Sequence, residues 1–234
     1  MFGLQNLAKI SNFNLIYRIL LPICIILLPI MLFFGLKLAL FDSPIDYQQG
    51  DAVRIMYIHV PSAWMSLLIY SIMALFAVFS FIFANPLLHI ASRAIAPIGA
   101  VFAFITLVTG ALWGKPIWGT YFVFDARLTS MLILFFLYVT YIIVVNSFED
   151  KKKGEKIAAI LAIIGFINIP LVKFSVEIFN SLHQPASIIR SGGVAIHQDM
   201  LNPLLIMFGS FFIYFVLFAL IRIKILLNIS RTPK

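Results

Sequence analysis

Six long apolar stretches restrict what this chain can fold into more than any other feature of its sequence. Each stretch is long enough to cross about 30 Å of hydrocarbon, which requires roughly 20 helical residues. Unpaired backbone groups are too costly in lipid, and the stretches lack the alternation of barrel strands, so each is predicted to form a helix. The stretches lie near residues 16–41, 60–84, 94–113, 128–147, 157–178 and 203–224.

The composition supports the same class of fold. Of the 234 residues, 62% are hydrophobic and 11% are charged, which gives a mean hydropathy of +1.06. That is too little polar surface to cover a water-soluble protein of this size. We therefore predict an all-α integral membrane protein, in which residues 1–234 form a single polytopic domain with six transmembrane helices. The first stretch is too long for a signal-peptide core and is expected to stay as an anchor.

The positions of lysine and arginine predict the orientation of the chain. With a cytoplasmic N-terminus, most basic residues fall in inner segments, among them the lysine-rich turn at 147–156. This imbalance favours both termini in the cytoplasm. The net charge of +8 is then spread over helix ends that contact the lipid bilayer, and no nucleic-acid partner is expected. The outer segments hold only Arg54, Lys115, Arg127 and Arg190.

This topology places three loops outside, near 42–59, 113–127 and 179–202, and the middle one is unusually aromatic. Connecting loops are usually small and polar, whereas this one looks suited to a large flat ligand. Its rings can stack on the faces of a porphyrin. The alternative is the aromatic belt found at membrane interfaces. The predicted ligand-binding residues of this segment are Trp113, Trp118, Tyr121, Phe122, Phe124 and Asp125.

The spacing within the aromatic segment suggests how its side chains are arranged. A helix that begins near Thr120 would place Trp118, Tyr121, Phe122 and Asp125 on one stripe. Three rings and a carboxylate would then face the same ligand.

Two of the four histidines share a local context, because His59 and His183 are each followed two residues later by proline. Proline biases the residue before it away from helix, so both histidines are predicted at outer helix ends of similar depth. Imidazole is a common axial ligand of haem iron, and we predict these two as the metal ligands. The alternative is an interfacial polar role. His89 is expected at the inner interface, and His197 is a reserve ligand.

Arg54 and Arg127 flank these candidates, and each is predicted to pair with a haem propionate. Pairing with Asp51, Asp125 or lipid phosphate is the alternative. Covalent haem attachment is excluded because Cys24 is the only cysteine, and no P-loop for ATP hydrolysis is present.

Six short segments of the sequence are D46-Y-Q-Q-G50, R54-I-M-Y-I-H-V-P61, W113-G-K-P-I-W-G-T120, D125-A-R-L-T-S130, S175-V-E and L182-H-Q. Together they resemble the CcmC family of cytochrome c maturation, and they occur in the same order as in that family. The resemblance implies a haem-transfer protein, not an enzyme. Such a protein holds haem b non-covalently and transiently at the outer face and passes it to the haem chaperone CcmE. The family's "WWD" segment falls on residues 113–130, with Trp113, Trp118 and Asp125, and its ligand histidines fall on His59 and His183.

The resemblance also implies partners and a location. The partners are the ABC transporter subunits CcmA and CcmB and the small membrane protein CcmD. The location is the bacterial inner membrane with the site facing the periplasm, and the mitochondrial inner membrane is the alternative. One departure is that Tyr121, Phe122 and Phe124 stand where the family commonly has tryptophan, so indole N–H donors are lost.

Two other functions stay open at this point. A b-type electron-transfer membrane cytochrome also uses two histidines, but these are normally buried on facing helices. A permease subunit of a haem exporter would show polar or helix-breaking residues near the bilayer midplane, where only Asn168 and Pro170 qualify.

Overall fold

The computed structural model describes residues 10–179, 183, 188, 193 and 195–231, and this part of the chain is helical apart from its connections. In chain order the elements are α2 (Ile10–Lys37), η1 (Leu38–Asp42), η2 (Asp51–Ile55), α3 (Met56–Phe83), α4 (Pro86–Trp118), α5 (Ala126–Asn146), α6 (Lys151–Gly165), α7 (Asn168–Ile178) and α8 (Gln198–Arg231).

Six helical units in the described part of the chain are long and apolar enough to cross a membrane. This confirms the predicted all-α membrane fold with six transmembrane helices. The spans are Ile10–Asp42, Asp51–Phe83, Pro86–Trp118, Ala126–Asn146, Lys151–Ile178 and Gln198–Ser230.

The fifth span is divided into α6 and α7, and Pro170 explains the break. Proline has no N–H and its ring clashes with the carbonyl four residues earlier, which here belongs to Phe166. That carbonyl instead accepts a hydrogen bond from the Ile169 N–H at 3.0 Å. The side chain of Asn168 is buried next to the break and donates to the Ser130 carbonyl at 2.9 Å. The Phe166 carbonyl and the Asn168 amide nitrogen are therefore both bonded within the protein.

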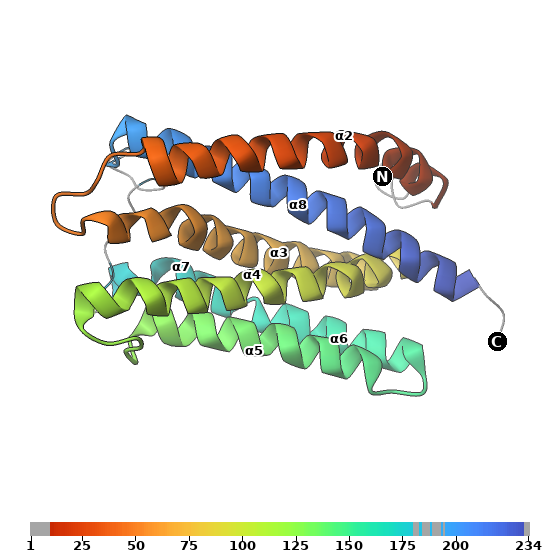
Figure 1. Cartoon of the computed structure of the whole chain (residues 1–234). Coiled ribbons are helices and arrows are strands. Elements are labelled where there is room, and N and C mark those ends of the chain that lie inside the picture. Colours follow the sequence, from red (N-terminus) through yellow and green to blue (C-terminus); the bar gives the residue numbers. More distant parts are fainter. Residues whose placement is uncertain (1–9, 180–182, 184–187, 189–192, 194, 232–234) are drawn as a thin grey trace.

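The helices run side by side as a bundle (Figure 1), in which α2 packs on α8, α3 on α4, and α5 on α6 and α7. The connections 43–50 and 119–125, the end of α7 and the start of α8 lie at one end. We call it the histidine end. The start of α2, the end of α8 and the turns at 84–85 and 147–150 lie at the opposite end.

Close helix packing around two tyrosines forms the centre of the core. Tyr70 and Tyr138 are fully buried, and their rings meet edge to face with centroids 5.1 Å apart. A side chain at Gly99 would overlap Tyr138, and one at Gly165 would overlap Tyr70. The two glycines therefore let α4 and α6 approach the tyrosines.

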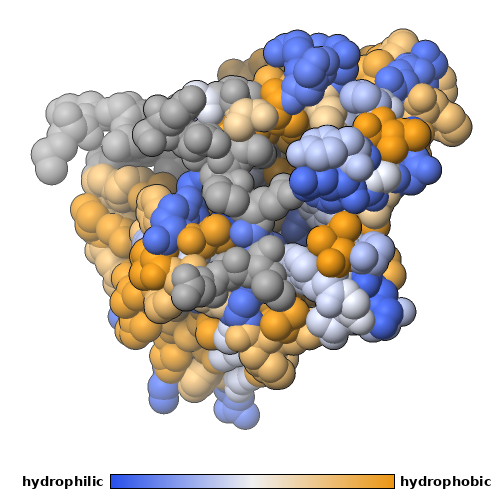
Figure 2. Space-filling view, turned by 90° about the vertical axis from the view of Figure 1, so that its left-hand side faces the viewer, coloured by the Kyte–Doolittle hydropathy of each residue, from blue (hydrophilic) through white to orange (hydrophobic). Residues whose placement is uncertain are grey.

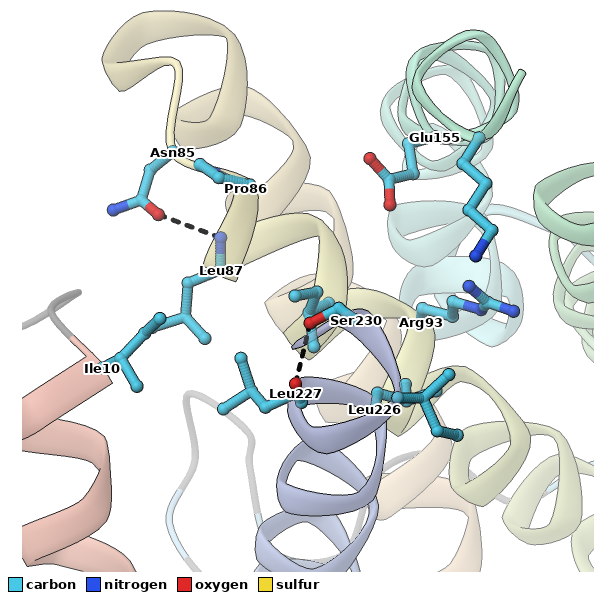
Figure 3. A pocket seen from close by; sticks show the side chains of 12 residues that line it. Ile10, Asn85, Pro86, Leu87, Arg93, Glu155, Leu226, Leu227 and Ser230 are labelled. Carbon is cyan, nitrogen blue, oxygen red and sulfur yellow. Dashed lines mark hydrogen bonds between the residues drawn. The ribbon is translucent and has the colours of Figure 1, made fainter. Parts of the chain in front are cut away.

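A cavity of about 610 Å³ lies at the opposite end, between α2, α4, α6 and α8 (Figure 3). Its walls are mainly apolar, and its polar side chains include Arg93 and Glu155. Next to it Asn85 caps α4, because its side-chain oxygen accepts from the Leu87 N–H at 2.9 Å.

Candidate functional site

The predicted site residues come together at the histidine end, from four separate parts of the chain. His59 is in the first turn of α3, Trp113 and Trp118 are in the last turns of α4, and Asp125 directly precedes α5. His183 lies in the connection between α7 and α8. The surface of this end mixes hydrophilic and hydrophobic residues (Figure 2).

The prediction that both histidines lie at helix ends is right for His59, in the first turn of α3, and wrong for His183. Pro61 lies inside α3, because the 3-10 helix η2 already starts the span upstream and leads directly into α3. Pro61 is the sixth residue of α3, so the helix lacks the hydrogen bond that an N–H at this position would donate to the Tyr57 carbonyl. His183 follows the end of α7 at Ile178 and is not in a helix. Its proline, Pro185, lies outside the described residues.

The His59 ring is held by α4. Its Nδ1 lies 3.1 Å from the Thr109 hydroxyl, and that hydroxyl also bonds the Ile105 carbonyl at 2.6 Å. A hydroxyl has one hydrogen, and a carbonyl only accepts, so the Thr109 oxygen accepts from the His59 Nδ1–H. The lone pair of the neutral ring is therefore on Nε2, the atom left for a metal.

Two further contacts fix the His59 ring. The Trp113 ring meets it edge to face, with centroids 5.6 Å apart. A Cβ atom at Gly110 would come within 2.9 Å of the His59 Cε1 atom, so any larger residue at this position would push the His59 ring aside. Trp113 is fixed in turn, because its indole N–H donates to the Gln49 side-chain oxygen at 2.8 Å.

The His183 ring is held by Asp125. Its Nδ1 lies 2.8 Å from one carboxylate oxygen of Asp125, and the Trp118 ring meets it with centroids 4.8 Å apart. Burial lowers the pKa of His183 below its usual value, against the opposing effect of the Asp125 carboxylate. The ring is therefore neutral at pH 7, with Nδ1–H donated to Asp125 and the lone pair on Nε2.

Asp125 also determines where α5 begins. Its other carboxylate oxygen accepts from the Leu128 N–H at 2.8 Å, as the N-cap of the helix. Caps of this kind stabilise a helix by about 0.5–2 kcal/mol. One carboxylate thus connects the start of α5 with His183.

The expected helix start near Thr120 is wrong. Helix α4 continues to Trp118 and ends at Gly119, whose φ of +76° suits glycine, and residues 120–125 are not helical. The predicted stripe on one helix face therefore does not form.

The three rings that replace tryptophans lie in this non-helical segment. The Phe122 and Phe124 rings meet edge to face, with centroids 5.1 Å apart. The Lys115 ammonium lies 5.0 Å from the centre of the Tyr121 ring. Phe124 is 88% exposed and Tyr121 is 55% exposed, so both rings can meet a ligand or lipid without rearrangement of the core.

The two arginines have protein partners. Arg54 donates through Nε to Asp51 at 3.0 Å, which is one of the alternatives weighed for it. Arg127 donates through Nε to the Ser175 hydroxyl at 3.2 Å and so joins α5 to α7. A role of either arginine toward propionates stays a prediction.

The other histidines lie apart from this pair. His89 is in the first turn of α4, at the opposite end of the bundle. His197 precedes α8, and its Nδ1 accepts from the Asp199 N–H at 3.3 Å. Within the described ranges, no group of three or more His, Cys, Asp or Glu side chains is arranged to hold a metal ion. Two separate imidazoles suit a metal whose other ligands come from a macrocycle.

Sequence reasoning missed Thr109, Gly110 and Gln49. Thr109 is 50 positions from His59, and Gln49 is 64 positions from Trp113, so local spacing carries no sign of either contact. Gln49 does belong to the D46-Y-Q-Q-G50 segment that resembled the CcmC family.

Comparison with known proteins identifies the family. The model of the CcmC family, described as heme exporter protein C, matches residues 3–233. The chain is 42% identical over 213 residues to heme exporter protein C of Bradyrhizobium diazoefficiens, an alignment that covers 91% of this chain and 81% of that protein. It is 43% identical over 211 residues to the Haemophilus influenzae protein of the same name, which covers 89% and 86%. It is also 43% identical over 193 residues to that of Escherichia coli, which covers 82% and 78%. These matches extend over nearly the whole chain, which therefore belongs to the CcmC family.

Proposed function

We propose that this chain binds haem at its histidine end and passes it to the haem chaperone CcmE during the maturation of c-type cytochromes. Haem is the cargo, and the role is one of handling rather than catalysis. The observation that carries the proposal is that His59 and His183 lie at the same end of the bundle, each with Nδ1 bonded to a side chain of the protein. The proposal assigns the Nε2 atom of each ring to the iron. The name of the family, heme exporter protein C, supports the choice of cargo.

The surroundings of the two imidazoles fit a haem. Each imidazole has an indole ring against it, Trp113 at His59 and Trp118 at His183. Aromatic faces and edges gain from contact with a porphyrin through burial and offset stacking. In this proposal Tyr121, Phe122 and Phe124 add further apolar contact.

The propionates of the haem require cationic partners. Arg54 and Arg127 are assigned this role, because a guanidinium can bond a carboxylate through two parallel N–H groups. Arg54 uses Nε for Asp51, and its terminal nitrogens suit a second carboxylate. The haem is bound non-covalently, since Cys24 lies within α2 and no other cysteine is present.

The position of His183 argues against a b-type electron-transfer cytochrome. In such proteins two histidines on facing helices hold the haem inside the bundle. Here only His59 is helical, and His183 lies in a connection at the end of the bundle. A haem held there can be presented to another protein. We propose that the haem is presented to CcmE. We also propose that the chain associates with the ABC transporter subunits CcmA and CcmB and with CcmD.

The proposal includes an orientation, with the histidine end facing the periplasm of a bacterial inner membrane. Lys151, Lys152 and Lys153 start α6 at the opposite end, which suits the cytoplasmic side. A periplasmic reporter enzyme fused after Thr120 is expected to be active, and the same reporter fused after Lys152 is expected to be inactive. The reverse pattern would place the site in the cytoplasm and contradict the proposed delivery.

The transfer itself is tested with purified components. Haem-loaded protein in detergent is mixed with haem-free CcmE, and the two are separated by an affinity tag on CcmE. We expect haem to move to CcmE on mixing, and His89→Ala to transfer as the wild type does, since His89 lies at the opposite end. Retention of all haem by the wild-type protein, or equal transfer to an unrelated tagged protein, would refute the role.

A further inference from the structure

In the proposed function both histidines bind iron through Nε2, but their Nδ1 atoms are supported by different chemical groups. His59 donates its Nδ1–H to a neutral hydroxyl, that of Thr109, at 3.1 Å. His183 donates its Nδ1–H to a carboxylate, that of Asp125, at 2.8 Å. Hydrogen bonds to an ionised acceptor are shorter and about twice as strong as neutral ones.

This difference reaches the iron through the ring. A carboxylate that accepts the Nδ1 proton draws it away from the imidazole and raises the basicity of Nε2. A hydroxyl that already donates its hydrogen to the Ile105 carbonyl does so far less. A bond from His183 to iron would therefore be stronger than one from His59.

We propose that Thr109 and Asp125 are positioning residues that make the two axial ligands unequal, so that an incoming ligand displaces His59 while haem stays on His183. The inference rests on the proposed haem-binding function. It assigns Asp125 an action through His183, with no direct contact to haem required. It also names Thr109, on α4, as the residue that sets the ring orientation of His59.

The packing around each ring agrees with this order of release. His59 is fixed to the bundle, because it is part of α3 and is enclosed by Thr109, Gly110 and Trp113 of α4. It cannot follow an iron atom that moves away. His183 lies outside the helices, with Trp118 against its ring. Once the bond to His59 breaks, the haem keeps one strong ligand and one stacking partner.

Carbon monoxide serves as the incoming ligand in the test. The reduced, haem-loaded protein is exposed to carbon monoxide, and the C–O and Fe–C stretching frequencies are recorded by infrared and Raman spectroscopy. These frequencies report the ligand on the opposite side of the iron. We expect the wild-type complex to match that of His59→Ala, in which only His183 remains, and to differ from that of His183→Ala. A wild-type spectrum that matches His183→Ala, or identical spectra for the two variants, would overturn the inference.

The supporting residues are tested in the protein that keeps both histidines. Thr109→Val preserves shape and removes the acceptor, and it is expected to raise the affinity for carbon monoxide about tenfold, within the range seen for such partners. Thr109→Ser keeps the hydroxyl and should restore the wild-type affinity. Gly110→Ala, which crowds the His59 ring, should act as Thr109→Val does. Equal affinities for the valine and serine variants would overturn the role of Thr109.

Asp125→Asn tests the carboxylate, because asparagine keeps a neutral acceptor and is also a good N-cap for α5. The frequencies of its carbon monoxide complex should shift from those of the wild type toward those of His183→Ala. Unchanged frequencies would contradict the role of Asp125, even if the single-histidine variants retain no haem. A wild-type protein that binds no haem at all would instead refute the proposed function.

Discussion

Replacing His59 or His183 with alanine is expected to lower the haem retained by the purified protein at least about tenfold and to abolish a six-coordinate spectrum. The magnitude follows because loss of an outer partner alone costs 10–100-fold in metal affinity, and loss of the ligand itself costs no less. The effect should be larger for His183, whose ring is supported by the Asp125 carboxylate. Haem content and absorption spectra of the detergent-purified variants measure it.

The matched control for both variants is His89→Ala. His89 is in the first turn of α4 at the opposite end of the bundle, so its loss should leave haem content and spectrum unchanged. Haem loss in this control, with normal haem in the His59 and His183 variants, would move the iron to the other end of the molecule. The proposed transfer mechanism would then be wrong.

Replacing Trp118 with alanine is expected to weaken haem binding about tenfold while the amount of protein in the membrane stays the same. An aromatic contact contributes about 0.5–1.5 kcal/mol beyond its buried area, and Trp118 also contacts His183. Loss of one ring should not affect insertion, because six spans anchor the chain. Haem titration of the purified protein and membrane fractionation give the two readouts.

Phe41→Ala is the control for Trp118. Phe41 is an aromatic residue at the same end of the bundle, 79% exposed, in η1. Its loss should leave haem affinity unchanged. Poor insertion of Trp118→Ala with normal haem affinity would show that the aromatic segment acts as a membrane anchor.

Hydropathy was enough to predict the number and type of the spans. Their internal features depend on single residues whose effect is decided by neighbouring structure. Pro170 divides the fifth span into α6 and α7, whereas Pro61 lies inside α3 without ending it. Gly119, and not Gly114 or Pro116, ends α4.

The residues proposed for the site could be named from the sequence, but their contacts could not. Repeated His-x-Pro context and the aromatic segment indicated His59, His183 and Trp118 without any knowledge of the fold. The contact between His183 and Asp125 joins residues 58 positions apart, and it places His183 beside the start of α5. Such a contact depends on how the helices pack, and this information is absent from local sequence patterns.

The electron paramagnetic resonance spectrum of the ferric haem bound to the purified wild-type protein tests the central claim most directly. Two imidazole ligands with engaged Nδ1 atoms predict a low-spin iron, and the signal should become high-spin in both His59→Ala and His183→Ala. A high-spin signal in the wild-type protein, or a low-spin signal that survives both substitutions, would contradict iron coordination by His59 and His183.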